Sequence, residues 1–101
     1  MKVLFVCNQG QNRSRTAAEI FKDKFKTKSA GLYSDKPITR QQLSWADIIM
    51  VMENRQRAEI AQRFPDIYMQ KRILALNISD VYRYKQRELI NTLQAKVSDL
   101  L

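Results

Sequence analysis

The only cysteine of this 101-residue chain stands six positions before an Arg-Ser pair. The segment reads Cys7-Asn8-Gln9-Gly10-Gln11-Asn12-Arg13-Ser14. A cysteine thiolate is a strong nucleophile, and a guanidinium presents a planar fork to two oxygens of an oxyanion. The spacing therefore predicts a nucleophile placed beside an oxyanion-binding group.

The segment between Cys7 and Arg13 has the features of an anion-binding loop. Lys2–Cys7 is a continuous apolar run typical of a buried parallel strand, and a helical pattern begins at Ser14. A short loop that enters a helix directs several backbone N–H groups into one concavity, and the helix dipole adds positive charge there. Gly10 can adopt backbone conformations closed to other residues, which helps the loop to curve.

We therefore expect phosphate or a similar oxyanion to bind in this loop. The positive field would favour the thiolate of Cys7, and Ser14 would donate a hydrogen bond to that thiolate or cap the helix. The expected phosphate-binding residues between Cys7 and Arg13 are Asn8, Gln9, Gly10, Gln11 and Asn12.

The residue counts narrow the chemistry further. One Cys and no His exclude a Ser-His-Asp triad, a Cys-His dyad, an internal disulfide and His-ligated zinc. We expect no metal and no cofactor. The net charge of +8 favours anionic partners, and the basic residues are spread along the chain without a long basic block. That spread argues against a basic arm for nucleic acid, although the charge alone keeps nucleic acid open as a partner.

Apolar runs alternate with helical patterns through the whole chain. The alternation predicts one α/β domain over residues 1–101, a three-layer α/β/α sandwich with a parallel sheet. In such a sheet, ligands bind beyond the carboxyl ends of the strands. The expected strands are Lys2–Cys7, Thr27–Tyr33, Asp47–Met52 and Lys71–Asn77, and the expected helices are Ser14–Lys26, Asn54–Phe64 and Gln86–Leu101.

No segment has the pattern of a membrane span or a targeting signal. The strongest apolar runs, Val3–Cys7 and Ile48–Met52, are too short to cross a bilayer. We expect a cytoplasmic protein without a membrane partner, in a reducing compartment that keeps the lone thiol reduced.

Four motifs together resemble a known family, the low-molecular-weight protein tyrosine phosphatases. They are Cys-x5-Arg-Ser after the first strand, Ser29-Ala30-Gly31 on the second, Trp45–Glu53 over the third and Asn77–Tyr82 after the fourth. The resemblance covers nearly the whole chain and is greatest to a compact branch of predicted tyrosine phosphatases. It implies a four-stranded parallel sheet of order 2-1-3-4. It also implies hydrolysis of phosphomonoesters, foremost protein phosphotyrosine, through a phosphocysteine on Cys7 with Arg13 binding the phosphate.

Such a reaction needs an acid for the leaving oxygen, and without His a carboxyl group is the obvious choice. Asp35, Glu53 and Asp80 follow the carboxyl ends of predicted strands. The resemblance selects Asp80, which matches the acidic loop of the family. The same resemblance implies that Tyr82 lines the site beside an aromatic phosphoester. The alternative is that Tyr82 only packs on the domain. The implied partner is a phosphorylated protein or a small aryl phosphate.

The chain also departs from the family pattern. Gln9 and Gly10 stand where typical members have Gly and Asn, and Asn12 replaces a second Cys found in many members. The changed loop supports an alternative function, a phosphate- or phosphoprotein-binding module with little turnover. Arsenate reduction is a further alternative, but with a single Cys it would need an external thiol.

Overall fold

Four parallel strands form one sheet in the computed structural model, which describes residues 1–101. The strands are β1 (Lys2–Cys7), β2 (Lys26–Gly31), β3 (Ile48–Val51) and β4 (Arg72–Ala75). Their order is β2-β1-β3-β4, and every pairing is parallel, as predicted. The strand order changes direction between β1 and β3, so the loop that follows β1 opens at the switch point where such sheets bind ligands.

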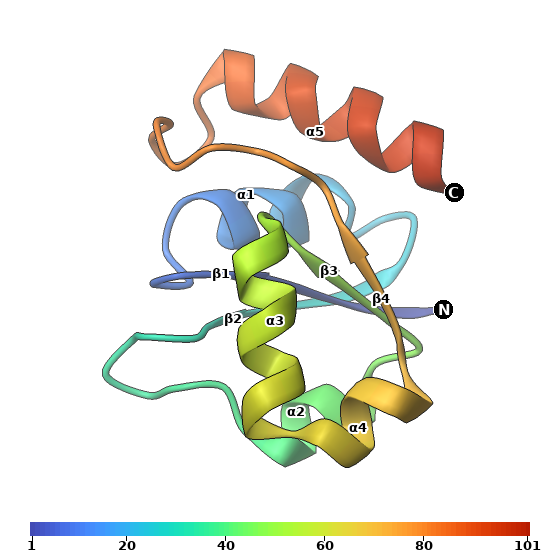
Figure 1. Ribbon diagram of the computed structural model, residues 1–101. Coiled ribbons are helices and arrows are strands. Elements are labelled where there is room, and N and C mark those ends of the chain that lie inside the picture. The colour runs from blue at the N-terminus through green and yellow to red at the C-terminus, as the bar shows by residue number, and fades with distance from the viewer.

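Helices cover both faces of the sheet, which confirms the predicted three layers (Figure 1). Helices α1 (Arg13–Ile20) and α5 (Arg87–Leu100) lie on one face. The other face carries the three helices α2 (Arg40–Trp45), α3 (Asn54–Arg63) and α4 (Pro65–Gln70). None of these helices is both long and apolar enough to cross a membrane.

The two hydrophobic cores divide the side chains of β1 between them. Val3, Phe5 and Cys7 pack with α1 and α5, whereas Leu4 and Val6 pack with the helices of the opposite face. Successive side chains of a strand point to opposite faces, so a strand covered on both sides must be apolar throughout. This explains the continuous apolar run that predicted the strand, and it places the Cys7 side chain on the α1 side.

The first helix is shorter than the sequence predicted. The pattern indicated a helix over Ser14–Lys26, but α1 ends at Ile20. Lys26 instead begins β2, where its N–H donates to the Met1 carbonyl at 3.0 Å. Pairing with β1 therefore overrides the helical pattern at the end of this segment.

Two short helices were missed by the sequence analysis. Helix α2 begins after Thr39, which forms a capping box with Gln42, and α4 begins at Pro65, a favoured first helical residue. Both are only six residues long, too short to show a periodic apolar pattern. The predicted helices near α3 and α5 agree with the structure to within one residue at each end.

Candidate active site

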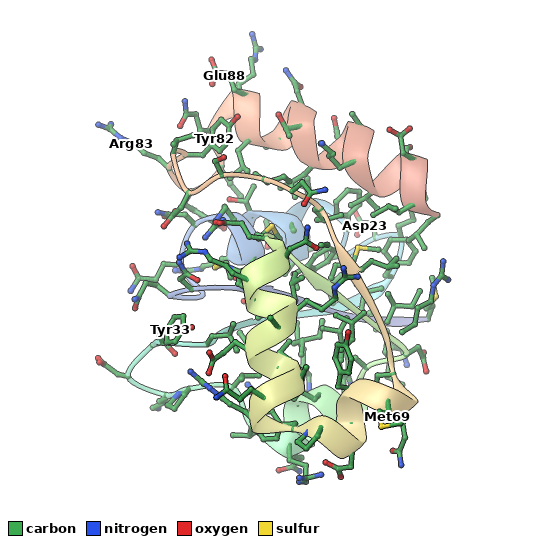
Figure 2. All side chains as sticks on the ribbon, in the orientation of Figure 1. Asp23, Tyr33, Met69, Tyr82, Arg83 and Glu88 are labelled. Atoms are coloured by element: carbon green, nitrogen blue, oxygen red, sulfur yellow. The ribbon has the colours of Figure 1, made fainter.

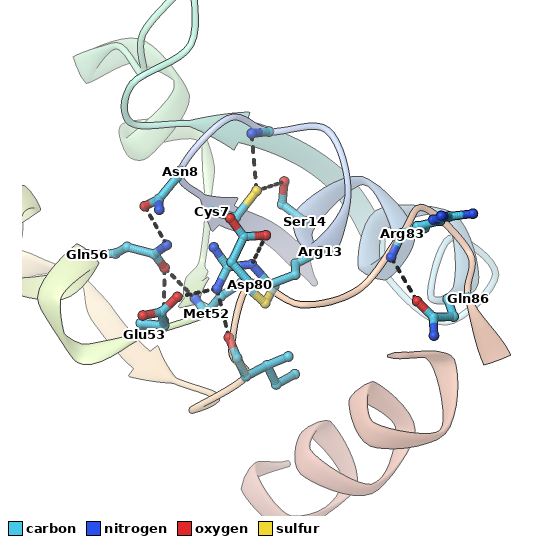
Figure 3. A network of polar contacts seen from close by, with 12 residues as sticks. Cys7, Asn8, Arg13, Ser14, Met52, Glu53, Gln56, Asp80, Arg83 and Gln86 are labelled. Atoms are coloured by element: carbon cyan, nitrogen blue, oxygen red, sulfur yellow. Dashed lines mark hydrogen bonds and ion pairs between the residues drawn. The ribbon is translucent and has the colours of Figure 1, made fainter. Parts of the chain in front are cut away.

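The sulfur of Cys7 lies at the end of β1, where the loop curves around it (Figure 3). The Gly10 N–H donates to this sulfur at 3.1 Å, and the Ser14 hydroxyl lies 3.0 Å from it. Cys7 and Ser14 are both buried. The sulfur thus has two polar neighbours within hydrogen-bond distance, one of them a backbone N–H that donates to it.

Two glycines allow the loop to take this shape. Gly10 has a φ of +71°, in the left-handed region, whereas Gln9 has no positive φ. The replacement of Gly by Gln at that position therefore requires no unusual backbone. A Cβ on Gly31 would lie 2.5 Å from the carbonyl carbon of Gln9, so only glycine lets β2 pass directly beneath the loop.

Arg13 is the first residue of α1, and its guanidinium is 1% exposed. Its Nη1 donates to the carbonyl of Ile78 at 2.7 Å and to the carboxylate of Glu53 at 2.5 Å. Its Nε and Nη2 atoms are buried and have no hydrogen-bond partner. Buried donors without partners cost free energy, so these two groups mark a position where an oxyanion would be bound.

Asp80 lies beside the same guanidinium. Its Oδ1 atom is 3.6 Å from Nε of Arg13, and its side chain is 50% exposed. In Figure 3 a dashed line joins this carboxyl group to the Arg13 guanidinium, beside Cys7. Asp35, another carboxyl considered from the sequence, is exposed in the segment after β2 and has no ion pair. The structure thus brings Asp80, a predicted site residue from a distant segment, to the predicted segment that holds Cys7, Arg13 and Ser14.

Solved structures of phosphatases share this architecture. The tyrosine phosphatase Wzb from Escherichia coli K30, in complex with phosphate, matches 98% of this chain and 94% of its own at 15% identity, with a TM-score of 0.80. A low-molecular-weight protein tyrosine phosphatase from T. tengcongensis matches 100% and 99% at 19% identity, with a TM-score of 0.78. A mutant of the YwlE arginine phosphatase with a phosphorylated active-site serine matches 100% and 95% at 20% identity, with a TM-score of 0.78.

The chain has the fold of the low-molecular-weight protein tyrosine phosphatases. The resemblance inferred from the motifs is therefore confirmed for the architecture over nearly the whole chain. No protein-family model matches the sequence. No curated protein matches it either.

Within this phosphatase fold, Glu53 anchors Arg13. Burial raises the pKa of the Glu53 carboxyl, but hydrogen bonds and charge from Arg13 and Arg55 outweigh burial, so the net pKa lies below its usual value. Arg55 contributes a contact of 3.0 Å to the second carboxylate oxygen. The sequence placed Glu53 among the possible acids, whereas the structure pairs it with two cations that favour its ionised form.

Gln56 is a buried residue that the sequence analysis missed. Its Oε1 accepts from the N–H groups of Met52 and Glu53 at 2.8 and 2.9 Å, and its Nε2 donates to Oδ1 of Asn8 at 2.9 Å. The side chain thus connects the end of β3 to the loop that follows β1 (Figure 3). The spacing from Glu53 to Gln56 is that of a capping box and could have revealed it.

Three of the predicted phosphate-binding residues have side chains that point to solvent. Gln9, Gln11 and Asn12 are exposed, and their side chains make no hydrogen bond within the chain. Asn12, not Ser14, occupies the N-cap position of α1, and its side chain makes no capping bond. This rules out the capping role considered for Ser14, whose hydroxyl instead faces Cys7.

Two tyrosines flank the mouth of the loop (Figure 2). Tyr82 is half-buried and packs against the core formed with α1 and α5. Tyr33 was missed by the sequence analysis. Its backbone N–H donates to the Asn8 carbonyl at 2.8 Å, and its exposed ring lies 5.1 Å from the Arg63 guanidinium. Tyr33 thus contacts the loop through its backbone, whereas Tyr82 packs on the core.

Proposed function

We propose that the chain is a phosphomonoester hydrolase, foremost a protein tyrosine phosphatase, that works through a phosphocysteine on Cys7. The observation that supports this most directly is that Nε and Nη2 of Arg13 are buried without a hydrogen-bond partner, at the end of a loop that surrounds a cysteine sulfur. An oxyanion held by those groups and by the backbone amides of residues 8–12 would place phosphorus next to the sulfur.

In the first step, the Cys7 sulfur attacks phosphorus. The sulfur–phosphorus bond forms as the bond from phosphorus to the leaving oxygen breaks, and Asp80 gives its proton to that oxygen. Arg13 and the loop amides hold the equatorial oxygens and stabilise their charge in the transition state. The Gly10 N–H and the Ser14 hydroxyl contact the sulfur and hold it in position for this attack.

In the second step, water attacks the phosphocysteine. Asp80, now ionised, takes a proton from the water, the sulfur–phosphorus bond breaks, and inorganic phosphate leaves. The Cys7 thiolate is restored and the Asp80 carboxyl is protonated again, so the cycle closes without a cofactor.

The site and the similar structures support a proposal for the substrate class. The similar structures include tyrosine phosphatases and an arginine phosphatase. We propose a phosphorylated protein as the substrate, with Tyr33 and Tyr82 as aromatic walls for the side chain that carries the phosphate. A small aryl phosphate serves as the probe.

The test is hydrolysis of p-nitrophenyl phosphate in the presence of a chelator, with vanadate as an oxyanion competitor. Wild type should turn over, and vanadate should inhibit it competitively. Cys7→Ser should bind vanadate but show no turnover, and Asp80→Asn should lower kcat by roughly 10²–10⁴-fold. Asp35→Asn is the matched control, because it removes the same charge from an exposed residue outside the site and should leave the activity unchanged.

The outcomes separate the alternatives. Turnover by Cys7→Ser equal to that of wild type would overturn the phosphocysteine mechanism. Wild type that binds a phosphotyrosine peptide but hydrolyses neither it nor the aryl phosphate would instead support the binding module. Comparing phosphotyrosine with phosphoarginine peptides then identifies the preferred substrate.

A further inference from the structure

A basic groove runs between α1 and the outer edge of β2, beside the site but outside it. The hollow has a volume of about 410 Å³. Arg15 contributes from α1 and Lys22 from the turn that follows it. Further polar lining comes from Thr27, Lys28 and Ser29 of β2 and from Tyr84 in the segment before α5. Neither the proposed mechanism nor the walls of the site use these residues.

The charge of the groove is positive. Glu19 is its only carboxylate, and it lies 2.7 Å from the Lys22 ammonium and 3.7 Å from that of Lys85. Arg15 has no ion pair, and its guanidinium lies 5.0 Å from the centre of the Tyr84 ring. The cations therefore outnumber the anion, and Arg15 is free to receive a further carboxylate.

The floor of the groove includes an unpaired strand edge. The Lys26 N–H donates to the Met1 carbonyl and the Leu32 N–H to the Cys7 carbonyl. The backbone N–H and C=O groups of the even-numbered residues of this strand therefore point toward β1. Residues of a strand alternate, so the N–H and C=O groups of Thr27 and Ser29 face outward, where no strand pairs with them. These groups lie two residues apart, which is the spacing at which an added strand forms its hydrogen bonds.

We propose that an extended acidic segment of the phosphoprotein substrate binds in this groove as an added strand beside β2. Its backbone pairs with Thr27 and Ser29, and its carboxylates face Arg15 and Lys22. The groove adjoins the site in the chain, because Arg15 follows Arg13 by two positions and Tyr84 follows Asp80 by four. That the segment belongs to a phosphoprotein rests on the proposed function, whereas its binding does not.

The free strand edge favours a peptide over nucleic acid. A peptide supplies N–H and C=O groups in the alternation that Thr27 and Ser29 require, whereas a phosphodiester backbone supplies no N–H donors. Tyr84 is also the only aromatic ring in the groove, whereas single-stranded nucleic acid stacks successive bases on several rings.

The first experiment measures binding of a fluorescent, unphosphorylated peptide of alternating Glu and Thr by anisotropy. Wild type should bind it, with an affinity that falls as salt is raised. N-methylation of one alternate set of residues should abolish binding, and methylation of the other set should not, because only one set faces β2. Equal effects of the two sets, no binding at all, or tighter binding of an RNA oligomer of equal charge would overturn the proposal.

The second experiment separates the groove from the overall charge. Arg15→Glu with Lys22→Glu should weaken peptide binding about tenfold or more. The matched control, Arg57→Glu with Lys96→Glu, makes the same charge change on α3 and α5 and should have a small effect. An equal loss of affinity in both double variants would show that only the overall charge attracts the peptide, and it would overturn the proposal that the peptide binds in this groove.

The kinetic experiment links the groove to turnover. For a phosphotyrosine peptide with this acidic segment, the Arg15→Glu, Lys22→Glu variant should raise KM with kcat unchanged. For p-nitrophenyl phosphate, both constants should match those of wild type. If wild type hydrolyses neither substrate, the proposed function is contradicted. If variant and wild type have equal KM values on the acidic peptide, binding of the substrate in the groove is contradicted.

Discussion

The Nη1 atom of Arg13 and the Oε1 atom of Glu53 are 2.5 Å apart, although the two residues are separated by 40 positions in the sequence. The contact joins the first residue of α1 to the N-cap residue of α3. It occupies Nη1 and leaves Nε and Nη2 without a hydrogen-bond partner, although Nε lies 3.6 Å from the Asp80 carboxylate. Glu53 therefore orients the cation without using the atoms that would bind an oxyanion.

Glu53→Gln should lower the free energy of unfolding by about 1–3 kcal/mol, because the buried Arg13 loses a charged partner. Urea unfolding at neutral pH measures this. Glu59→Gln is the control, since Glu59 has the same 26% exposure but pairs with an Arg63 side chain that is 29% exposed, against 1% for Arg13. Glu59→Gln should lower the free energy of unfolding by less than about 1 kcal/mol. A Glu53→Gln loss no larger than the control would contradict the anchoring role.

The contribution of Glu53 to stability should depend on pH in one direction. Burial raises the pKa of this carboxyl, but hydrogen bonds from Arg13 and Arg55 outweigh burial and hold its pKa in the folded protein below the usual 4.5. The stabilisation is therefore fully present above pH 4.5 and is lost as pH falls through the lower pKa of the folded state. Unfolding titrations of wild type and Glu53→Gln should differ by a constant free energy near neutral pH and converge in acid. A difference that grows in acid would contradict this.

Gln56→Leu should lower the free energy of unfolding by about 2–4 kcal/mol, because it leaves the N–H groups of Met52 and Glu53 without their acceptor. The exposed Gln62 lies on the same helix and provides the control, Gln62→Leu, which should have little effect. Both are measured by urea unfolding. Equal stability of the two variants would show that the Gln56 hydrogen bonds contribute little.

Gly31→Ala should displace the loop, because the added Cβ would meet the Gln9 carbonyl carbon at 2.5 Å. We expect a loss of about 1–3 kcal/mol in unfolding free energy and weaker vanadate binding. Ser29→Ala, on the same strand, should leave vanadate binding intact. Vanadate affinity of Gly31→Ala equal to that of wild type would show that the loop tolerates the methyl group.

Arg13→Lys should lower kcat/KM for an aryl phosphate by roughly 10²–10³-fold or more, because an ammonium cannot replace both Nε and Nη2 as donors. Thermal unfolding, measured alongside, shows whether the variant remains folded. An active, folded Arg13→Lys variant would contradict the proposed role of the guanidinium. Lys36→Arg, on an exposed loop, provides a control for the exchange of the two cations.

Local patterns predicted the parts of this protein that depend on neighbours in the chain. Both the apolar run of β1 and the Cys-x5-Arg-Ser segment could be recognised from the sequence. A strand buried on two faces must be apolar along its length, and a loop that enters a helix provides an anion-binding position. The residue at which α1 ends could not be predicted from the sequence. It depends on where β2 pairs with β1, and that pairing joins residues that are distant in sequence.

The sequence by itself determined the α/β class, the parallel sheet and the choice of Cys7 and Arg13 as the chemical pair. The family resemblance selected Asp80 among the carboxyl groups, but only the tertiary structure shows where each lies: Glu53 binds Arg13 from the end of β3, Asp80 faces it from beyond β4, and Asp35 remains apart. All three follow the ends of predicted strands in the sequence. What separates them is distance in space, which is set by strand order and by the direction each loop takes after its strand, and neither is encoded within any one segment.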